Sequence, residues 1–324
     1  MSSKKQLPLF KDETVLPTGK HHVSYSEISD WMDCSFRHKL KHIDKIALDS
    51  PSIHTEYGRA IHDTLEHYIL TREPMDSKVV QDTIVRFQNM CEVLKEEKNI
   101  AISDKDIKDF SGSVASMLEQ VPVFLDTDFP GWQGFAAEHF LFEKIDGQTN
   151  KWFKGFIDSV IKIPKGNRRA ATKLSSVAKK NQPMMRLSDL VKEVTPKAPV
   201  VPVSFSEGSE YWIFDWKTTS WGWPAERKRD FQKQLQLVLY KHFFCRLFGL
   251  RLDQVKCGFV LLKRTPKKSD GSVVELVPVS VGPKTEQKAV EVLHDMINQI
   301  QTRRTIKNRA SCRFCEFANT VHCP

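Results

Sequence analysis

The chain has 324 residues, and its hydrophobic fraction of 40% suffices for the packed core of one large domain or two smaller ones. No apolar run approaches the roughly 18 residues that span a bilayer, and the polar first 20 residues lack the apolar stretch of a secretory signal, so we expect a cytoplasmic protein without a membrane partner. The net charge of +9 favours a polyanionic partner such as nucleic acid, although a basic protein without such a partner has the same composition.

The N-terminal part is predicted to be a flexible tail over residues 1–22, followed by one domain over residues 23–324. Ser24 and Glu27 have the spacing of a capping box, and apolar residues then recur at helical spacing to about His42. A second helix is expected to start near Gly58. The predicted helical part of the domain spans residues 58–125, with breaks at Pro74 and near residues 98–104.

Strands follow this helical part. Residues 135–145 and 151–163 are predicted to pair as a hairpin, because the turn-forming residues 146–150 separate them. The next predicted strand covers residues 211–218. Residues 164–210 between them are rich in Lys, Arg, Ser and Pro, and we expect a basic, mobile insertion there, or a solvated loop without a role.

The C-terminal third combines helices and strands. A helix is predicted over residues 231–248, strands over residues 255–264 and 273–281, and a further helix over residues 285–304. A cysteine-rich tail occupies residues 310–324. This order predicts an α/β fold, in which a central mixed sheet is flanked by helices.

The strand at residues 211–218 carries the strongest chemical signal. Side chains two apart on a strand share a face, so Asp215 and Lys217 point the same way while Phe214 and Trp216 pack inward. An acid beside a lysine offers a place for a metal ion and an activated water. Asp158, on a neighbouring antiparallel strand, would bring a second carboxylate to one Mg²⁺ or Mn²⁺ ion.

Seven cysteines fall into two groups. Three lie in apolar or helical contexts and are predicted to be buried thiols: Cys91, Cys245 and Cys257. The spacing of Cys312 and Cys315 is typical of residues that grip one metal centre. Cys323 lies in the same tail, and Cys34 would complete a set of four. Zinc is one candidate metal, with His322 available in place of a cysteine.

Aromatic and basic residues follow the strand that carries Lys217. Trp221, Trp223 and Phe231 flank Arg227, Lys228 and Arg229. Aromatic faces stack on the bases of single-stranded DNA and cations follow its phosphates, so this segment is a candidate for DNA contact. A packed loop with solvated charges is the alternative.

Four motifs occur in the order seen in RecB-type nucleases of the PD-(D/E)XK superfamily. They are Gly58-Arg59-Ala60-Ile61-His62, Gly155-x-x-Asp158, Asp215-x-Lys217-Thr218 and Gln236-x-x-x-Tyr240. Ser24-Tyr25-Ser26 with Cys34 also resembles the start of that domain. The resemblance spans about residues 24–323 and implies the restriction-endonuclease-like fold.

The resemblance assigns roles by position. It implies that Asp158 and Asp215 bind the metal ion, together with His62 and the main-chain carbonyl of Trp216. Lys217 matches the catalytic lysine. Gln236 and Tyr240 match a motif that positions DNA and the active site, and their spacing places them on one helix face. Two alternatives stay open, since Tyr240 also suits a core position and Glu138 is either a further acid near the metal or a solvated strand residue.

The four cysteines outside the core resemble those of iron–sulfur RecB-type nucleases, which include AddB and the CRISPR-associated adaptation nucleases. This resemblance implies a [4Fe–4S] cluster held by Cys34, Cys312, Cys315 and Cys323, which joins the two ends of the domain. The gap of seven residues between Cys315 and Cys323 is longer than usual in that group.

These features predict a Mg²⁺- or Mn²⁺-dependent DNA exonuclease acting in DNA repair, recombination or replication. The competing hypothesis is a non-catalytic, nuclease-like DNA-binding subunit of a recombination or replication assembly. The sequence has no Gly-x-x-x-x-Gly-Lys phosphate loop, so a helicase partner would be a separate chain.

Overall fold

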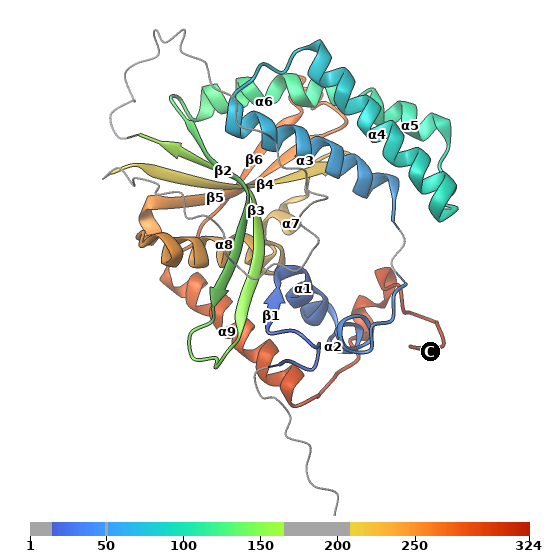
Figure 1. The fold of residues 1–324 in the computed structure, drawn as a ribbon, viewed down its shortest axis with the longest axis vertical. Helices are drawn as coiled ribbons and strands as arrows, with labels where there is room; N and C mark the ends of the chain where they lie inside the picture. Colours follow the sequence, from blue (N-terminus) through green and yellow to red (C-terminus); the bar gives the residue numbers. More distant parts are fainter. Residues whose placement is uncertain (1–14, 49–50, 165–207) are drawn as a thin grey trace, which may run out of the picture.

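The chain folds into a central mixed sheet with helices on both faces, as the sequence predicts (Figure 1). The computed structural model describes residues 15–48, 51–164 and 208–324. The elements of the first half are β1 (His22–Ser24), α1 (Tyr25–Asp33), α2 (Ser35–His38), a π-helical turn (Lys39–Ile43), α3 (Ile53–Thr71), α4 (Ser77–Lys98), α5 (Asp104–Ser111) and α6 (Val114–Asp128). The elements of the second half are β2 (Gln133–Lys144), β3 (Trp152–Ile163), β4 (Glu210–Thr219), α7 (Ala225–Arg229), α8 (Phe231–Phe248), β5 (Val255–Lys263), β6 (Val274–Val279), α9 (Pro283–Gln301) and two 3₁₀ turns (Leu252–Gln254 and Arg309–Phe314).

The sheet is mixed in direction. β2 and β3 form the predicted antiparallel hairpin, and β4 continues the sheet antiparallel to β3. β5 is parallel to β4, and β6 is antiparallel to β5. The short strand β1 runs parallel to the start of β3.

β3 and β4 separate part of the way along the sheet, and we call this point the fork. They pair from Ile163 with Glu210 to Ser159 with Phe214, and β4 then continues beside β5 alone. On the same edge of β3, β1 pairs with residues 152–154. Residues 155–158 therefore lie between β1 and β4 without a strand partner on that edge in the described part of the chain. Asp158 on β3 and Asp215 on β4 lie next to the last pair, Ser159 with Phe214, on the side where the two strands separate.

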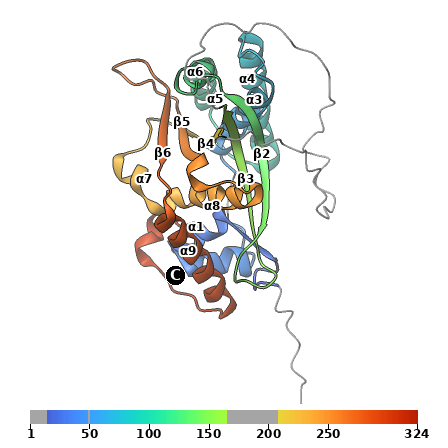
Figure 2. The same ribbon diagram turned by 90° about the vertical axis from the view of Figure 1, so that its left-hand side faces the viewer.

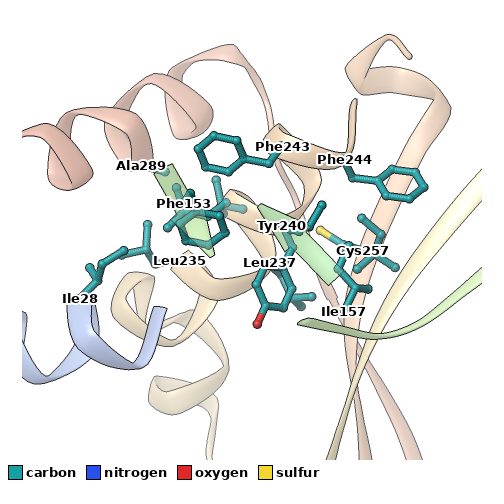
Figure 3. Packing of buried hydrophobic residues seen from close by; sticks show 14 of the residues in the cluster. Ile28, Phe153, Ile157, Leu235, Leu237, Tyr240, Phe243, Phe244, Cys257 and Ala289 are labelled. Atoms are coloured by element: carbon teal, nitrogen blue, oxygen red, sulfur yellow. The ribbon is translucent and has the colours of Figure 1, made fainter. Parts of the chain in front are cut away.

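Two hydrophobic clusters cover the two faces of the sheet. One joins the sheet to α3, α4, α5 and α6, and contains Phe214 and Trp216. The other joins it to α1, α8 and α9, and contains Phe153, Tyr240 and Phe243 (Figures 2 and 3). Phe153 and Phe243 stack with ring centroids 4.6 Å apart. Phe214 and Trp216 thus pack inward as predicted.

The first helix is shorter than the sequence indicates. Ser24 caps α1 by accepting a hydrogen bond from the Glu27 amide, in agreement with the predicted N-cap. The Glu27 carboxylate is buried and lies 3.4 Å from Nε2 of His38. The chain adopts an extended conformation at Cys34, with φ of −165°, so the expected single helix to about His42 is divided there into α1, α2 and the π-helical turn.

The other elements lie close to their predicted positions. α3 begins at Ile53 rather than near Gly58, because Ser52 accepts a hydrogen bond from the Thr55 amide and caps the helix earlier. α8 spans Phe231–Phe248 as predicted, between the N-cap Asp230 and a left-handed Gly249. None of the helices in the described ranges is long and apolar enough to cross a membrane.

Two predicted segments fall largely outside the described residues. Residues 1–14 of the expected tail are outside them, whereas Leu16 and Thr18 are buried. Most of the expected basic insertion, residues 165–207, is likewise outside them.

Candidate active site

Asp215 and Lys217 form an ion pair at the fork. Both side chains leave the same face of β4, and Nζ of Lys217 lies 2.5 Å from Oδ2 of Asp215. The Asp215 residue is fully buried, whereas the Lys217 side chain is 36% exposed. Among the residues that the structure describes, Oδ1 of Asp215 has no hydrogen-bond partner. A buried carboxylate oxygen without a partner is costly unless a ligand satisfies it.

Asp158 bridges the gap that opens at the fork. Its Oδ2 atom accepts a hydrogen bond of 2.9 Å from the Trp216 amide, which faces no partner strand on that side of β4. The indole Nε1 of Trp216 donates to Oγ of Ser159 at 2.8 Å. These two bonds fix Asp158 against the strand that carries Asp215 and Lys217.

His62 reaches the site from α3. Its Nδ1 atom lies 3.5 Å from Oδ2 of Asp158, and its ring also hydrogen-bonds the main chain of Trp216. Burial lowers the pKa of His62, although the carboxylate of Asp215 opposes this effect. A neutral imidazole is the form that ligates metal ions.

Glu138 is the residue whose place the sequence left open. One carboxylate oxygen of Glu138, one of Asp158 and one ring nitrogen of His62 lie within 4.8 Å of one another. Glu138 lies between the pairs Ala137–Ser159 and His139–Ile157 of the β2–β3 hairpin, with a left-handed φ of 44°. Burial, reinforced by the charge of Asp158, raises its pKa to about 7. Such a backbone conformation is uncommon for glutamate and leaves no signal in strand periodicity.

The electrostatics of the site favour a bound cation. Burial raises the pKa of Asp158, and it raises that of Asp215 to about 6 although Lys217 opposes the shift. Burial disfavours the charged form of Lys217, yet Asp215 and Asp158 outweigh it and raise the Lys217 pKa. The lysine is therefore an ammonium group at neutral pH and not a base. A further positive charge would let all three carboxylates ionise.

The donor set fits a hard divalent ion. The carboxylates of Glu138 and Asp158 and the imidazole of His62 lie close enough together to ligate one Mg²⁺ or Mn²⁺ ion. The unpartnered Oδ1 of buried Asp215 is a further candidate ligand. Asp158 belongs to the set with His62 and Glu138, and its charge also acts on Asp215. The carboxylate of Asp158 thus lies between the two halves of the site.

Gln236 and Tyr240 lie on α8 at the edge of the same site. Nε2 of Gln236 donates to the Tyr240 hydroxyl at 3.3 Å. The Tyr240 ring packs among apolar residues while its hydroxyl points away from them, so the tyrosine belongs to the core and also reaches the site (Figure 3). A Cβ at Gly155 would lie 2.6 Å from Cε1 of Tyr240, which explains why the motif Gly155-x-x-Asp158 requires glycine here.

The four non-core cysteines line one cavity of about 200 Å³. α2 and the C-terminal tail, which are far apart in sequence, lie side by side there (Figure 1). The Asn308 amide donates to Sγ of Cys34 at 3.3 Å, and Nε of Arg37 lies 2.9 Å from Glu316 in the tail. His322 is exposed and is not among the residues that line the cavity. Cys91, Cys245 and Cys257 are buried, as predicted.

The aromatic residues proposed to stack on DNA differ in exposure. Trp221 is 79% exposed and available to a ligand. Trp223 is buried instead, with its ring 4.9 Å from that of Phe259 and the Arg227 guanidinium over it. Lys228 pairs with Glu275. Trp223 therefore packs in the interior and Lys228 is held in an ion pair, in agreement with the alternative of a packed loop.

Comparison with known proteins gives one family. The model of the PD-(D/E)XK nuclease superfamily matches residues 22–180 and 203–320, which is most of the chain. No curated protein matched the chain. The matched ranges include both sides of the fork and three of the four non-core cysteines, Cys34, Cys312 and Cys315. The chain belongs to the PD-(D/E)XK nuclease superfamily.

Proposed function

We propose that this protein is a DNA nuclease of the RecB type that depends on Mg²⁺ or Mn²⁺ and acts as an exonuclease. The observation that carries the proposal is the meeting of Asp158 and Asp215 at the fork beside Lys217, with one oxygen of the buried Asp215 left unpartnered among the described residues. His62, Glu138 and the Trp216 carbonyl are the further ligand candidates.

The residues of the site divide the work of phosphodiester hydrolysis. When bound, a divalent ion offsets charge on the phosphate and makes water easier to deprotonate. The carboxylates of Asp158 and Asp215 would hold the ion, and the Trp216 amide and Lys217 fix the orientation of these carboxylates. The Lys217 ammonium, which lies beside Asp215, would stabilise the negative charge that develops during the reaction. Gln236 lines a pocket together with this lysine, and its amide donates a hydrogen bond to the Tyr240 hydroxyl.

We further propose that Cys34, Cys312, Cys315 and Cys323 hold a [4Fe–4S] cluster. The four cysteines line one cavity where α2 meets the C-terminal tail. Their resemblance to the cysteines of iron–sulfur RecB-type nucleases supports a cluster over a single zinc ion.

The proposed role is strand degradation in DNA repair, recombination or replication, in the cytoplasm. A helicase or recombination protein would be a separate partner chain. Residues 23–324 would form one nuclease domain, and the basic residues of the insertion would add to its positive charge.

Cleavage of end-labelled DNA tests the proposal. Single-stranded and duplex substrates are incubated with the wild type, Lys217→Ala and Lys105→Ala, in Mg²⁺, in Mn²⁺ and in a chelator. Lys105 lies exposed on α5, away from the site, and serves as the matched control. We expect metal-dependent cleavage, unchanged in Lys105→Ala and lowered about 100- to 1,000-fold in Lys217→Ala.

Products released one nucleotide at a time from an end would support exonuclease action. Equal, metal-independent rates for the wild type and Lys217→Ala would reject the proposal. DNA binding without metal-stimulated cleavage would favour the non-catalytic DNA-binding subunit.

A further inference from the structure

A second polar pocket adjoins Lys217 between α1, the π-helical turn, α7 and α8. Its volume is about 320 Å³, at the lower end of the roughly 300–1,000 Å³ of sites that bind small molecules. Lys217 and Gln236 line this pocket as well as the candidate active site. The pocket is therefore the space that a substrate would enter next to the reacting group.

Positive charge dominates the lining of this pocket. Its cations are Lys41, Lys217, Arg227 and Lys233, and its one acid among the described residues is Asp30. That acid is already engaged, since Oδ2 of Asp30 lies 2.8 Å from Nε2 of His42 and Oδ1 lies 3.4 Å from Arg37. The pocket thus has a surplus of positive charge.

Two of these cations have no acidic partner in the described part of the chain. Lys233, near the start of α8, is half-buried and makes no ion pair there, and the Arg227 guanidinium lies 4.7 Å from the Trp223 ring centroid without a carboxylate contact. Neighbouring Lys228, by contrast, is neutralised by Glu275. Unpaired cations that line a pocket beside a catalytic group indicate an anionic ligand.

The remaining walls match the other parts of a nucleotide. Ser26 and Ser29 on α1 offer hydroxyl groups, and Trp223 and Phe259 give an apolar side. Nζ of Lys41 lies 3.5 Å from Asp30 and 3.9 Å from Glu316, so its position is fixed from two sides. The pocket combines cations, hydroxyls and an apolar wall within the size of one nucleotide.

We propose that this pocket binds one nucleotide unit of the DNA strand, with its phosphate against Lys233 and Arg227, next to the phosphodiester that meets Lys217. The proposal rests on the proposed nuclease function for its substrate class. A free deoxynucleoside monophosphate carries the same phosphate, sugar and base. Such a monophosphate therefore binds the pocket in the absence of a divalent ion and competes there with DNA.

Calorimetric titration of the full chain in a chelator tests this. The ligands are thymidine monophosphate and thymidine, and the proteins are the wild type, Lys233→Gln, Arg227→Gln and the control Lys105→Gln. We expect the wild type to bind the monophosphate at least about tenfold more tightly than the nucleoside. We expect either pocket substitution to weaken monophosphate binding about tenfold, as loss of one charge-assisted contact does, and Lys105→Gln to leave it unchanged.

Equal affinity for nucleoside and monophosphate, no measurable binding, or unchanged affinity in both pocket variants would overturn the proposal. Circular dichroism verifies that the two pocket variants are folded. DNA cleavage by the wild type in Mn²⁺ is measured in parallel. Cleavage without monophosphate binding at this pocket rejects the pocket and keeps the nuclease, whereas binding that depends on Lys233 without cleavage keeps the pocket as a nucleotide site and rejects the nuclease.

Discussion

The fork and the cysteine-lined cavity both gather metal-ligating side chains, and they are built in opposite ways. At the fork, the ladder between β3 and β4 sets the positions of the two aspartates, and Asp215 is fully buried. At the cavity, the tail meets α1 and α2 through single contacts, such as Nδ2 of Asn308 with the Asp33 carbonyl at 2.9 Å, and Phe314 is 85% exposed.

This difference teaches what each site needs from its metal. The fork is formed by hydrophobic packing and backbone pairing, which hold carboxylates together in spite of their repulsion. Apart from the buried Phe317, the described tail has little buried apolar surface, so a metal centre would supply much of the energy that fixes it. We therefore expect metal loss to abolish activity at the fork and to lower stability at the tail.

The largest expected effect is that of Asp215→Asn. We expect DNA cleavage to fall by about 1,000-fold or more, because a carboxylate ligand of the metal ion is lost. In the metal-free protein, by contrast, the same substitution should raise the free energy of unfolding. The pKa of Asp215 is raised to about 6 from an unfolded value of about 3.9, so its ionised form destabilises the fold, and this penalty grows as pH rises from about 4 through 6.

Denaturant unfolding in a chelator measures this stability change. Asp215→Asn should raise the free energy of unfolding by about 1 to 3 kcal/mol at pH about 8, and by less at pH about 4.5. A variant less stable than the wild type at every pH would show that the carboxylate stabilises the empty site, contrary to our account.

The next effect concerns the tail. Cys312→Ala should lose the metal of the proposed cluster, which is about four irons per chain after anaerobic purification. It should also lower the melting temperature by several degrees, because the contacts between the tail and α2 loosen. Cys91→Ala is the matched control, since Cys91 is buried in the helical cluster and lies away from the cavity.

Iron and zinc analysis with visible absorbance checks this prediction. Cys91→Ala should keep its iron even if it loses stability through a small core cavity. One zinc per chain in the wild type, or unchanged iron in Cys312→Ala, would contradict the cluster.

The smallest expected effects are those of alanine substitutions at two motif glycines, Gly155 and Gly58. Gly155→Ala places a methyl group 2.6 Å from Tyr240, and we expect a loss of about 1 to 3 kcal/mol in stability and slower cleavage. At Gly58, a methyl group would meet Oγ1 of Thr218 at 3.5 Å, so Gly58→Ala should gain about 0.5 to 1 kcal/mol from helix propensity. Thermal unfolding distinguishes them, and equal destabilisation would refute the steric explanation for Gly155.

Much of the fold can be predicted from the sequence, because the local signals for these helices and strands favour the same conformation as the packing of the folded chain. α8 follows from an Asp cap, an apolar run and a terminal Gly249. The pairing of β3 with β4 follows from the strand order, and it brings Asp158 near Asp215. Ser52 is a sequence signal for the start of α3 at Ile53, five residues before the predicted start near Gly58.

Other features depend on tertiary contacts that no local pattern encodes. Glu138 reaches the site through a left-handed backbone conformation inside a strand, which residue periodicity cannot reveal. At the helix break, the thiol of Cys34 faces the tail and contacts Ile306 and Asn308, which lie near the other end of the sequence. Trp223 is buried by its packing on Phe259 from β5, although a charged run begins three residues after it.

The central claim is that Asp158 and Asp215 share one divalent cation at the fork beside Lys217. Anomalous diffraction from crystals of the wild type and Asp215→Asn grown with Mn²⁺ tests it most directly. We predict a manganese peak between the two carboxylates in the wild type, and its loss in the variant. Manganese bound elsewhere, with the fork empty in both proteins, would contradict the account.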